Sequence, residues 1–216
     1  MWFAGPARRA PLAGRPQALR LGFDLERGMT VGLYGGSFNP AHNGHAHVAE
    51  TAKRRLRLDR VIWLVSPQNP LKSRHETADL ADRLAGARAL AQGYGMVVAA
   101  VETQLGSNYT IDTIRGLKAR FPGVKFVWIM GADSLASFHR WKGWTQIMHE
   151  VPILVVSRPW ISLKSRFSPA AVRFARFRKS PQSGPRLAYA KTPAWTFLFG
   201  RFHFQSSTAL RARRKG

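Results

Sequence analysis

Short apolar runs alternate with longer segments of mixed polarity from residue 30 onward, and this alternation limits the possible folds more than any other feature of the chain. The apolar runs hold successive Val, Ile, Leu and Trp residues, without the polar–apolar alternation of a half-exposed strand. Continuous apolar strands are typical of a parallel sheet that is covered on both faces. The repeated order of strand, helix and strand therefore predicts an α/β fold.

The segments can be assigned individually. The expected strands are residues 30–34, 60–66, 95–102, 124–131 and 151–157, and residues 195–205 are interpreted as one late strand or two short ones. The expected helices are residues 44–58, 76–92, 110–121 and 168–179, the last with Ser168 as N-cap and Pro169 at its first position. We expect a single-domain, Rossmann-like, doubly wound parallel sheet with helices on both faces and right-handed crossovers.

Residues 1–28 differ from the rest of the chain. They are rich in Arg, Pro, Ala and Gly, and their first acidic residue is Asp24. The segment lacks the continuous apolar core of a secretory signal, although an organelle transit peptide would share its composition. We expect either a flexible N-terminal extension or an upstream start codon with Met29 as the natural start, so that the domain occupies residues 29–216.

The charge balance is strongly basic. The 216 residues include 34 Lys and Arg against 11 Asp and Glu, a formal net charge of +23. Such a surplus attracts polyanions, including nucleic acid, anionic membranes and nucleotide phosphates, but it can equally reflect solvated basic faces. No apolar run approaches the ~20 residues that span a bilayer, which excludes an integral membrane protein. The absence of Cys excludes disulfides and thiol chemistry and fits a cytoplasmic location.

The segment YGGSFNPAHNGHAHVAE, residues 34–50, carries the strongest local signal for a binding site. A glycine pair ends the first strand, a short polar loop follows, and a helix begins near Gly44. Gly35 and Gly36 allow the backbone to approach a phosphate, and the start of the helix offers free N–H groups to an anion. His42 and His45 are three positions apart, so both imidazoles can converge on the same pocket.

Other interpretations of this segment are weaker. No Gly-Lys-Ser/Thr follows the glycines, so it is not a Walker loop, and it does not match the Gly-x-Gly-x-x-Gly fingerprint of dinucleotide-binding proteins. His42, His45 and His47 could form a metal cluster, but their spacing is a poor match for helix-borne metal ligands. We expect no protein-bound metal, with His47 on the surface or in packing.

The segment GGSFNPAHNGH resembles the signature of the nucleotidyltransferase superfamily that carries an [H/T]-x-G-H motif after its first strand. Five further segments resemble consecutive motifs of bacterial nicotinate-nucleotide adenylyltransferases, in the order expected for that family. They are SPQNPLK (66–72), NYTIDTI (108–114), GADSLASFHRWKGW (131–144), VVSRP (155–159) and SSTALR (206–211). The resemblance implies transfer of the adenylyl group of ATP to nicotinate mononucleotide, which gives deamido-NAD and pyrophosphate.

The resemblance also implies roles for individual residues. The catalytic residues would be His42, His45, Lys72 and Arg211, with His45 stabilising the transition state at the α-phosphoryl group. The ATP site would use Gly35, Gly36, Ser37, Phe38, Gly131, Asp133, Arg158, Ser206, Ser207 and Thr208, with Asp133 also capping the helix after its strand. The nicotinate mononucleotide site would use Asn69, Thr110 and Trp141, with Trp141 stacking on the nicotinate ring and Trp144 in the core. Mg²⁺ would be bound mainly through the ATP phosphates.

Two competing functions remain at this point. A phosphopantetheine adenylyltransferase of the same superfamily would share the His-x-Gly-His and SSTALR-type motifs, but it would not be expected to carry GADSLASFHRWKGW or NPLK. A basic nucleic-acid-binding protein would fit the charge, and RFSPAAVRFARFRK (166–179) has suitable basic and aromatic residues, but no RNA-recognition signature is present. We expect ATP and nicotinate mononucleotide as partners, with no membrane and no specific nucleic acid; self-association into a homo-oligomer is left open.

Overall fold

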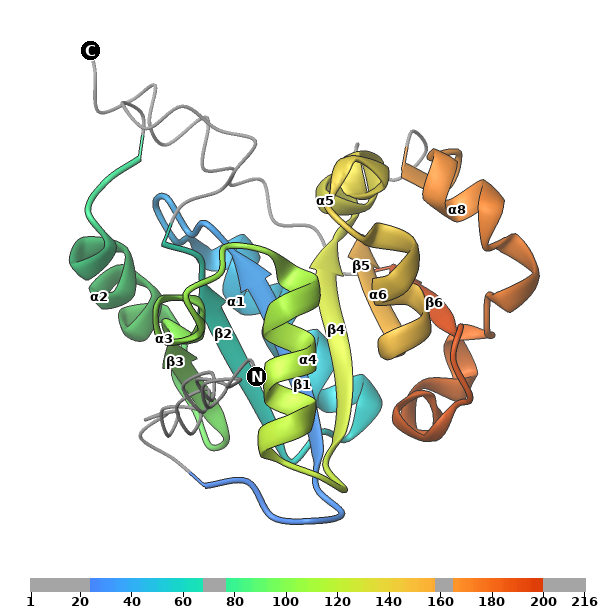
Figure 1. Ribbon diagram of the computed structural model, residues 1–216, viewed down its shortest axis with the longest axis horizontal. Coiled ribbons are helices and arrows are strands. Elements are labelled where there is room, and N and C mark those ends of the chain that lie inside the picture. The colour runs from blue at the N-terminus through green and yellow to red at the C-terminus, as the bar shows by residue number, and fades with distance from the viewer. Residues whose placement is uncertain (1–23, 68–76, 158–164, 200–216) are drawn as a thin grey trace, which may run out of the picture.

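The protein forms a six-stranded, entirely parallel sheet with the strand order β3-β2-β1-β4-β5-β6 (Figure 1). The computed structural model describes residues 24–67, 77–157 and 165–199. The strands are β1 (Thr30–Gly36), β2 (Arg60–Val65), β3 (Met96–Ala99), β4 (Lys125–Gly131), β5 (Ile153–Ser157) and β6 (Trp195–Phe199). This strand order is that of a doubly wound dinucleotide-type fold, and it confirms the predicted fold class.

Two of the expected strands differ most from the prediction. The strand expected at 95–102 ends at Ala99, and Val101–Leu105 form the helix α3. β3 is the edge strand, and its ladder with β2 covers only Met96 to Ala99, so the apolar residues beyond it have no strand to pair with. The late segment contains the single strand β6, and the expected residues 200–205 lie outside the described part of the chain.

The helices lie close to their expected positions. They are α1 (Asn43–Leu56), α2 (Leu80–Leu90), α4 (Thr110–Arg120), α5 (Ala132–Ser137), α6 (Trp144–Glu150) and α8 (Pro169–Arg173), with 3₁₀ helices η2 (Phe138–Arg140), η3 (Ala175–Phe177) and η4 (Pro181–Tyr189). The Ser168 hydroxyl accepts the N–H of Ala171 at 3.3 Å, which confirms the predicted N-cap. The helix expected at 168–179 is shorter than predicted, because it ends at Arg173 and the chain tightens into η3.

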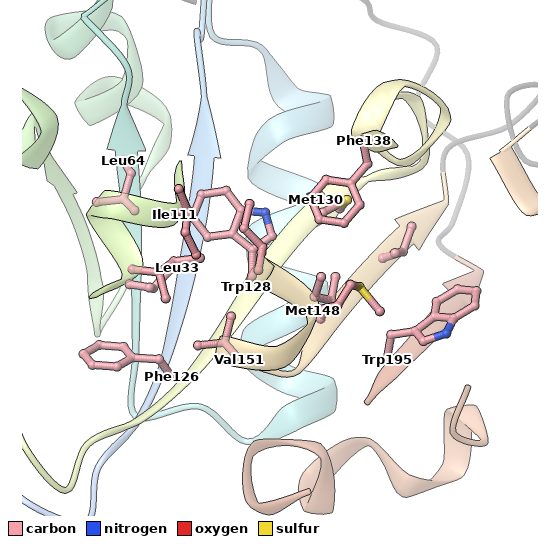
Figure 2. Packing of buried hydrophobic residues seen from close by; sticks show 14 of the residues in the cluster. Leu33, Leu64, Ile111, Phe126, Trp128, Met130, Phe138, Met148, Val151 and Trp195 are labelled. Carbon is pink, nitrogen blue, oxygen red and sulfur yellow. The ribbon is translucent and has the colours of Figure 1, made fainter. Parts of the chain in front are cut away.

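Two hydrophobic clusters cover the two faces of the sheet. One packs β-strand side chains such as Leu33 and Trp128 against Ile111 and Ile114 of α4 and against α6 (Figure 2). The other packs the opposite face against Val48 of α1, and against α2 and η4. In Figure 1, α4 and α6 lie in front of the sheet and α1 lies behind it. Both faces are therefore buried, as the continuous apolar strands predicted.

Residues 24–28 pack against the domain, which corrects part of the predicted N-terminal extension. Leu25 is buried in the cluster that includes α4, and the N–H of Gly28 donates to the carbonyl of Gly123 at 3.1 Å. These contacts form because the segment runs beside the start of β1. The packed chain thus includes residues before Met29. Residues 1–23 of the predicted extension lie outside the described part of the chain.

Across residues 24–67, 77–157 and 165–199, none of the helices combines the length and the apolar character that crossing a bilayer requires.

Candidate active site

The topology predicts a ligand site at the carboxyl ends of the central strands. From β1 the chain builds outward to β2 and β3 on one side, then returns to add β4, β5 and β6 on the other. The strand order therefore reverses between β1 and β4, and ligands of open parallel sheets bind at such a switch point. The residues that follow these two strands are the loop 37–42, which leads into α1, and the start of α5.

His42 and His45 together cap the N-terminus of α1. The Nδ1 atom of His42 accepts the N–H of Gly44 at 3.1 Å, and the Nδ1 atom of His45 accepts the N–H of His42 at 3.2 Å. This reciprocal arrangement is a capping box built from two imidazoles. Because both Nδ1 atoms accept hydrogen bonds, the proton of each neutral ring is on Nε2, and each ring can donate from that atom.

The two imidazoles lie against each other, which confirms that they converge. Their ring centroids are 3.9 Å apart, with an interplanar angle of 38°. His42 is buried and His45 is half-buried. Two Nε2–H donors at the positive end of a helix form a suitable site for an oxyanion such as a phosphoryl group.

Phe38 supports His45 from the core side. Its side chain is 2% exposed, and its ring meets the His45 ring edge to face with centroids 5.0 Å apart. The Phe38 ring also contacts Tyr34 and Trp63. The backbone of Phe38 has φ 46°, a left-handed conformation that is uncommon for a bulky residue. The Phe38 side chain therefore packs under the proposed site, and an ATP contact would have to come from its backbone.

The two glycines at the end of β1 have packing reasons for their identity. A Cβ atom on Gly35 would lie 2.3 Å from the Trp128 indole, and one on Gly36 would lie 3.0 Å from the Phe38 ring. Gly35 is thus needed because Trp128 of the neighbouring strand fills that space. This reason is independent of any phosphate, so the proposed ATP contact of Gly35 and Gly36 stays a prediction.

The start of α5 is the second segment that follows a central strand at this edge of the sheet. Gly131 is buried at the end of β4 and is itself the N-cap of α5, with no side-chain capping bond. Asp133 is exposed and lies inside the first turn of the helix. The prediction that Asp133 caps this helix is therefore wrong, because the helix begins at Ala132, before the carboxylate. Asp133 still lies in the first turn after β4, at the edge of the sheet where ATP was expected.

Thr110 and Trp141, which were predicted to bind the mononucleotide, belong to two segments that lie side by side. Thr110 is the first residue of α4, and the ring of its neighbour Tyr109 lies 4.0 Å from the Lys142 ammonium. A Cβ atom on Gly143 would lie 3.4 Å from Ile111, so the loop after Trp141 packs on the first turn of α4. The structure thus brings the Thr110 and Trp141 segments together.

Trp141 is a half-buried residue at the margin of the core. Its indole meets Trp128 and Phe138 edge to face, with ring centroids 6.2 Å and 5.3 Å apart. Trp144 is half-buried as well and packs against Phe138 and Phe174. The expected contrast between a ligand-stacking Trp141 and a core Trp144 is therefore weaker than predicted, because both rings contact Phe138 and both are half-buried.

Several predicted site residues lie outside the described ranges: Asn69, Lys72, Arg158, Ser206, Ser207, Thr208 and Arg211. Their roles stay predictions. His47, predicted on the surface or in packing, is half-buried, with its Nε2 3.5 Å from the Thr51 hydroxyl. Among the residues that the structure describes, no three His, Cys, Asp or Glu side chains are grouped so that they could hold a metal ion.

The sequence analysis missed two buried polar residues near the loop 37–42. Arg83 of α2 is 3% exposed, and Glu102 of α3 is 5% exposed. Glu102 hydrogen-bonds the Ser66 side chain, and burial raises the pKa of Glu102 to about 7. In the sequence, Arg83 looks like an ordinary helix-surface residue and Glu102 is the last residue of the expected strand 95–102, so only the tertiary structure shows their burial.

Replacing Glu102 with Gln should raise the free energy of unfolding above pH 7 and leave it nearly unchanged near pH 4.5. Burial raises the folded-state pKa from 4.5 to about 7, so the unfolded chain releases the proton first as pH rises. The unfolding free energy of the wild type should therefore fall between these values and then level off. One pKa unit is worth about 1.4 kcal/mol, so the variant gains up to about 3 kcal/mol.

The measurement is urea denaturation of both proteins from pH 4.5 to pH 8.5. Glu50→Gln is the matched control, since Glu50 is an exposed residue of α1 and its replacement removes the same charge. A gain that is equal for both variants, or that does not depend on pH, would assign the effect to net charge and not to the burial of Glu102.

Comparisons with known proteins identify the family of the chain. A family model described as cytidylyltransferase-like matches residues 33–213. A probable nicotinate-nucleotide adenylyltransferase of Caulobacter sp. (strain K31) is 68% identical over 185 residues, which are 86% of this chain and 98% of that protein. A protein of the same name from Methylorubrum extorquens (strain PA1) is 53% identical, over 86% of this chain and its own full length.

The chain belongs to the nicotinate-nucleotide adenylyltransferase family. The fold agrees with a solved structure as well. A nicotinic acid mononucleotide adenylyltransferase of Plasmodium falciparum, complexed with APC, superposes with a TM-score of 0.62, covering 85% of this chain and 83% of that chain. The same enzyme complexed with NaAD gives a TM-score of 0.61. Because the sequence identities are 13% and 15%, these two matches show similarity of fold alone.

Proposed function

We propose that this member of the family transfers the adenylyl group of ATP to nicotinate mononucleotide, forming deamido-NAD and pyrophosphate. The observation that carries the proposal is the pair of imidazoles at the N-terminus of α1, whose Nδ1 atoms accept the capping hydrogen bonds, at the switch point of the sheet. Oxyanions bind at such a position. Family membership supports the choice of substrates.

The reaction needs little covalent help from the protein. A phosphate oxygen of the mononucleotide attacks the α-phosphorus of ATP, the bond between this phosphorus and the bridging oxygen breaks, and pyrophosphate leaves. The nucleophile is already an anion, so no side chain has to remove a proton from it. Catalysis then consists of aligning two anions and stabilising the charge that develops on the α-phosphoryl oxygens. This supports direct in-line transfer without a covalent enzyme intermediate.

The proposed roles of the residues follow from their positions. His42 and His45 donate from Nε2 to ATP phosphates, with His45 at the α-phosphoryl group, and the amino end of α1 adds its positive dipole. Backbone groups of residues 35–38, together with Gly131 and Asp133, border the rest of ATP. We assign Lys72, Arg158 and Arg211 to the phosphates on the family motif alone, and likewise the SSTALR hydroxyls.

The mononucleotide is proposed to lie across the Thr110 and Trp141 segments. The Tyr109–Lys142 contact and the packing of Gly143 on Ile111 hold these segments together. An indole face is a suitable platform for the nicotinate ring. Thr110 and Asn69 would border the nicotinate carboxylate.

Mg²⁺ fits the donor set at this edge of the sheet if ATP supplies most of its ligands. Asp133 is the carboxylate that the described residues place in the first turn after β4, and Mg²⁺ commonly uses one or two carboxylates, several waters and substrate phosphates. When bound, Mg²⁺ neutralises phosphate charge. We therefore propose that it enters with ATP and not as a resident of the protein.

Nucleotide-free protein should accordingly bind Mg²⁺ weakly, and a non-hydrolysable ATP analogue should strengthen the binding at least tenfold. The reason is that the protein offers few carboxylate ligands of its own. Calorimetric titration of Mg²⁺ with and without the analogue measures the difference, and metal analysis of the purified protein is the control. Tight retention of Mg²⁺ or Zn²⁺ by nucleotide-free protein would contradict the proposal and favour the histidine-cluster interpretation.

The decisive experiment is pyrophosphate release from ATP with three acceptors compared side by side. Nicotinate mononucleotide should be the best substrate, nicotinamide mononucleotide a poorer one, and phosphopantetheine inactive. Turnover with phosphopantetheine alone would assign the chain to the competing adenylyltransferase. Salt-sensitive polynucleotide binding without any turnover would favour a nucleic-acid-binding protein.

We also propose a cytoplasmic location for the protein, because the reaction consumes ATP.

A further inference from the structure

Arg83 is a buried cation whose guanidinium holds backbone carbonyls from three segments of the chain. Its side chain is 3% exposed, although most of α2 around it is exposed or half-buried. Nε donates to the carbonyl of Ala78 at 2.8 Å. Nη1 donates to Ser37 at 3.0 Å and Ser66 at 2.6 Å, and Nη2 donates to Pro67 at 2.7 Å.

Further hydrogen bonds also join these segments, among them the bond from the N–H of Ala78 to the Oδ1 atom of Asn39 at 3.4 Å. Ser37 begins the loop after β1, Ser66 and Pro67 directly follow β2, and Ala78 precedes α2. The N–H of Ser66 also donates to the carbonyl of Gly36 at 3.0 Å, which extends the pairing of β1 with β2 by one bond. Arg83 therefore links the start of the loop 37–42 to the end of β2.

Ser37 directly precedes Phe38, whose ring packs against the His45 imidazole. Phe38 follows it with φ 46°, and the buried Phe38 ring contacts the His45 ring edge to face at 5.0 Å. A shift of the Ser37 carbonyl would change the backbone at Phe38 and move its ring. Because Phe38 is packed between Tyr34, Trp63 and His45, such a shift would reach the imidazole.

The bonding pattern shows what kind of side chain the position requires. Burial lowers the pKa of Arg83, and the nearby charge of Asp79 raises it, but a guanidinium stays protonated in proteins. The guanidinium donates four hydrogen bonds to carbonyls, and a planar fork can reach several at once. A lysine would keep the charge and could not reproduce the fork.

We propose that Arg83 is a positioning residue for adenylyl transfer, which holds the loop 37–42 against the end of β2 and thereby keeps Nε2 of His45 aligned with the α-phosphoryl group. The inference rests on the proposed function. Its effect is on the rate constant, since a displaced donor stabilises the transition state less while the substrates keep most of their binding contacts.

The experiment compares kcat and KM of Arg83→Lys and Arg83→Met with those of the wild type, after circular dichroism has shown that the variants are folded. Both should lose at least tenfold in kcat, with KM for ATP and nicotinate mononucleotide changed less than about threefold. Arg88→Met is the matched control, since Arg88 is exposed on the same helix, and its kcat should stay unchanged. Inactive wild type would count against the proposed function, and the Arg83 comparison isolates the inference.

A double-mutant cycle tests whether Arg83 acts through His45. In the His45→Ala background, Arg83→Met should lower kcat by less than about threefold more, because the group that it positions is already gone. If the two losses multiply, Arg83 acts independently of His45 and the proposal is overturned. Full kcat in folded Arg83→Lys would overturn it too, since charge alone would then suffice. If neither variant folds, Arg83 is a residue of general stability and the proposal fails.

Discussion

Replacing His45 with Ala should lower kcat by about 10²–10³, while KM for ATP changes much less. The Nδ1 atom of His45 is occupied by the N–H of His42, so Nε2–H is the donor that the ring can present to a phosphoryl oxygen. Negative charge on the α-phosphoryl oxygens grows in the transition state, and loss of one preorganised donor has an effect of this size. Steady-state kinetics with both substrates measures it.

The capping box makes a structural control necessary. His45→Ala also removes an acceptor from the N-terminus of α1, which costs about 1 kcal/mol of stability. His45→Gln restores an acceptor at this helix position, as Gln does in ordinary capping boxes. It should recover the stability but only a minor part of kcat. His47→Ala, on the same helix, should keep normal turnover. Near-normal kcat in His45→Ala, or full recovery in His45→Gln, would show that His45 acts only as a cap.

The fold and the centre of the site were predictable because both depend on local pattern. Strands such as Arg60–Val65 and Ile153–Ser157 are continuous apolar runs, and only a sheet covered on both faces buries them completely. The loop after β1 was recognisable from its glycine pair, and the spacing of His42 and His45 placed both rings on one side of a helix start.

The features that the sequence did not predict are those that depend on tertiary contacts. The run VVAAVE favours a strand by composition, yet β3 is an edge strand and its pairing partner ends at the level of Ala99. The packing reason for Gly35 could not be predicted either, since the Trp128 indole lies where its Cβ would be, while its ATP contact stays a prediction. Arg83 lies in the segment ADRLAGAR, which has the composition of an exposed helix. Apart from the local bond to Ala78, its guanidinium is satisfied by carbonyls that follow β1 and β2, which no local pattern encodes.

Replacing Trp141 with Ala should raise KM for nicotinate mononucleotide about ten- to a hundredfold and leave KM for ATP nearly unchanged. The Trp141 indole makes edge-to-face contacts with Trp128 and Phe138, and it remains half-buried. A pyridinium ring stacked on it gains aromatic and cation–π contributions, and their loss corresponds to about 1.4–2.7 kcal/mol. The adenosine part of ATP is proposed to lie on the other side of the phosphates, near Gly131 and Asp133, so ATP binding should not depend on this ring.

Matched variants separate stacking on the ligand from packing on the core. Trp144→Ala removes the same type of side chain three positions away, where the ring packs on Phe138 and Phe174, and it should lower stability without a selective change in either KM. Trp141→Phe keeps an aromatic ring on the cluster with a smaller face, so its KM for the mononucleotide should lie between wild type and Trp141→Ala. If Trp144→Ala reproduced the selective rise, or if Trp141→Ala weakened both substrates equally, the indole would be a support of the loop. The nicotinate ring would then bind elsewhere along the edge between α4 and α5.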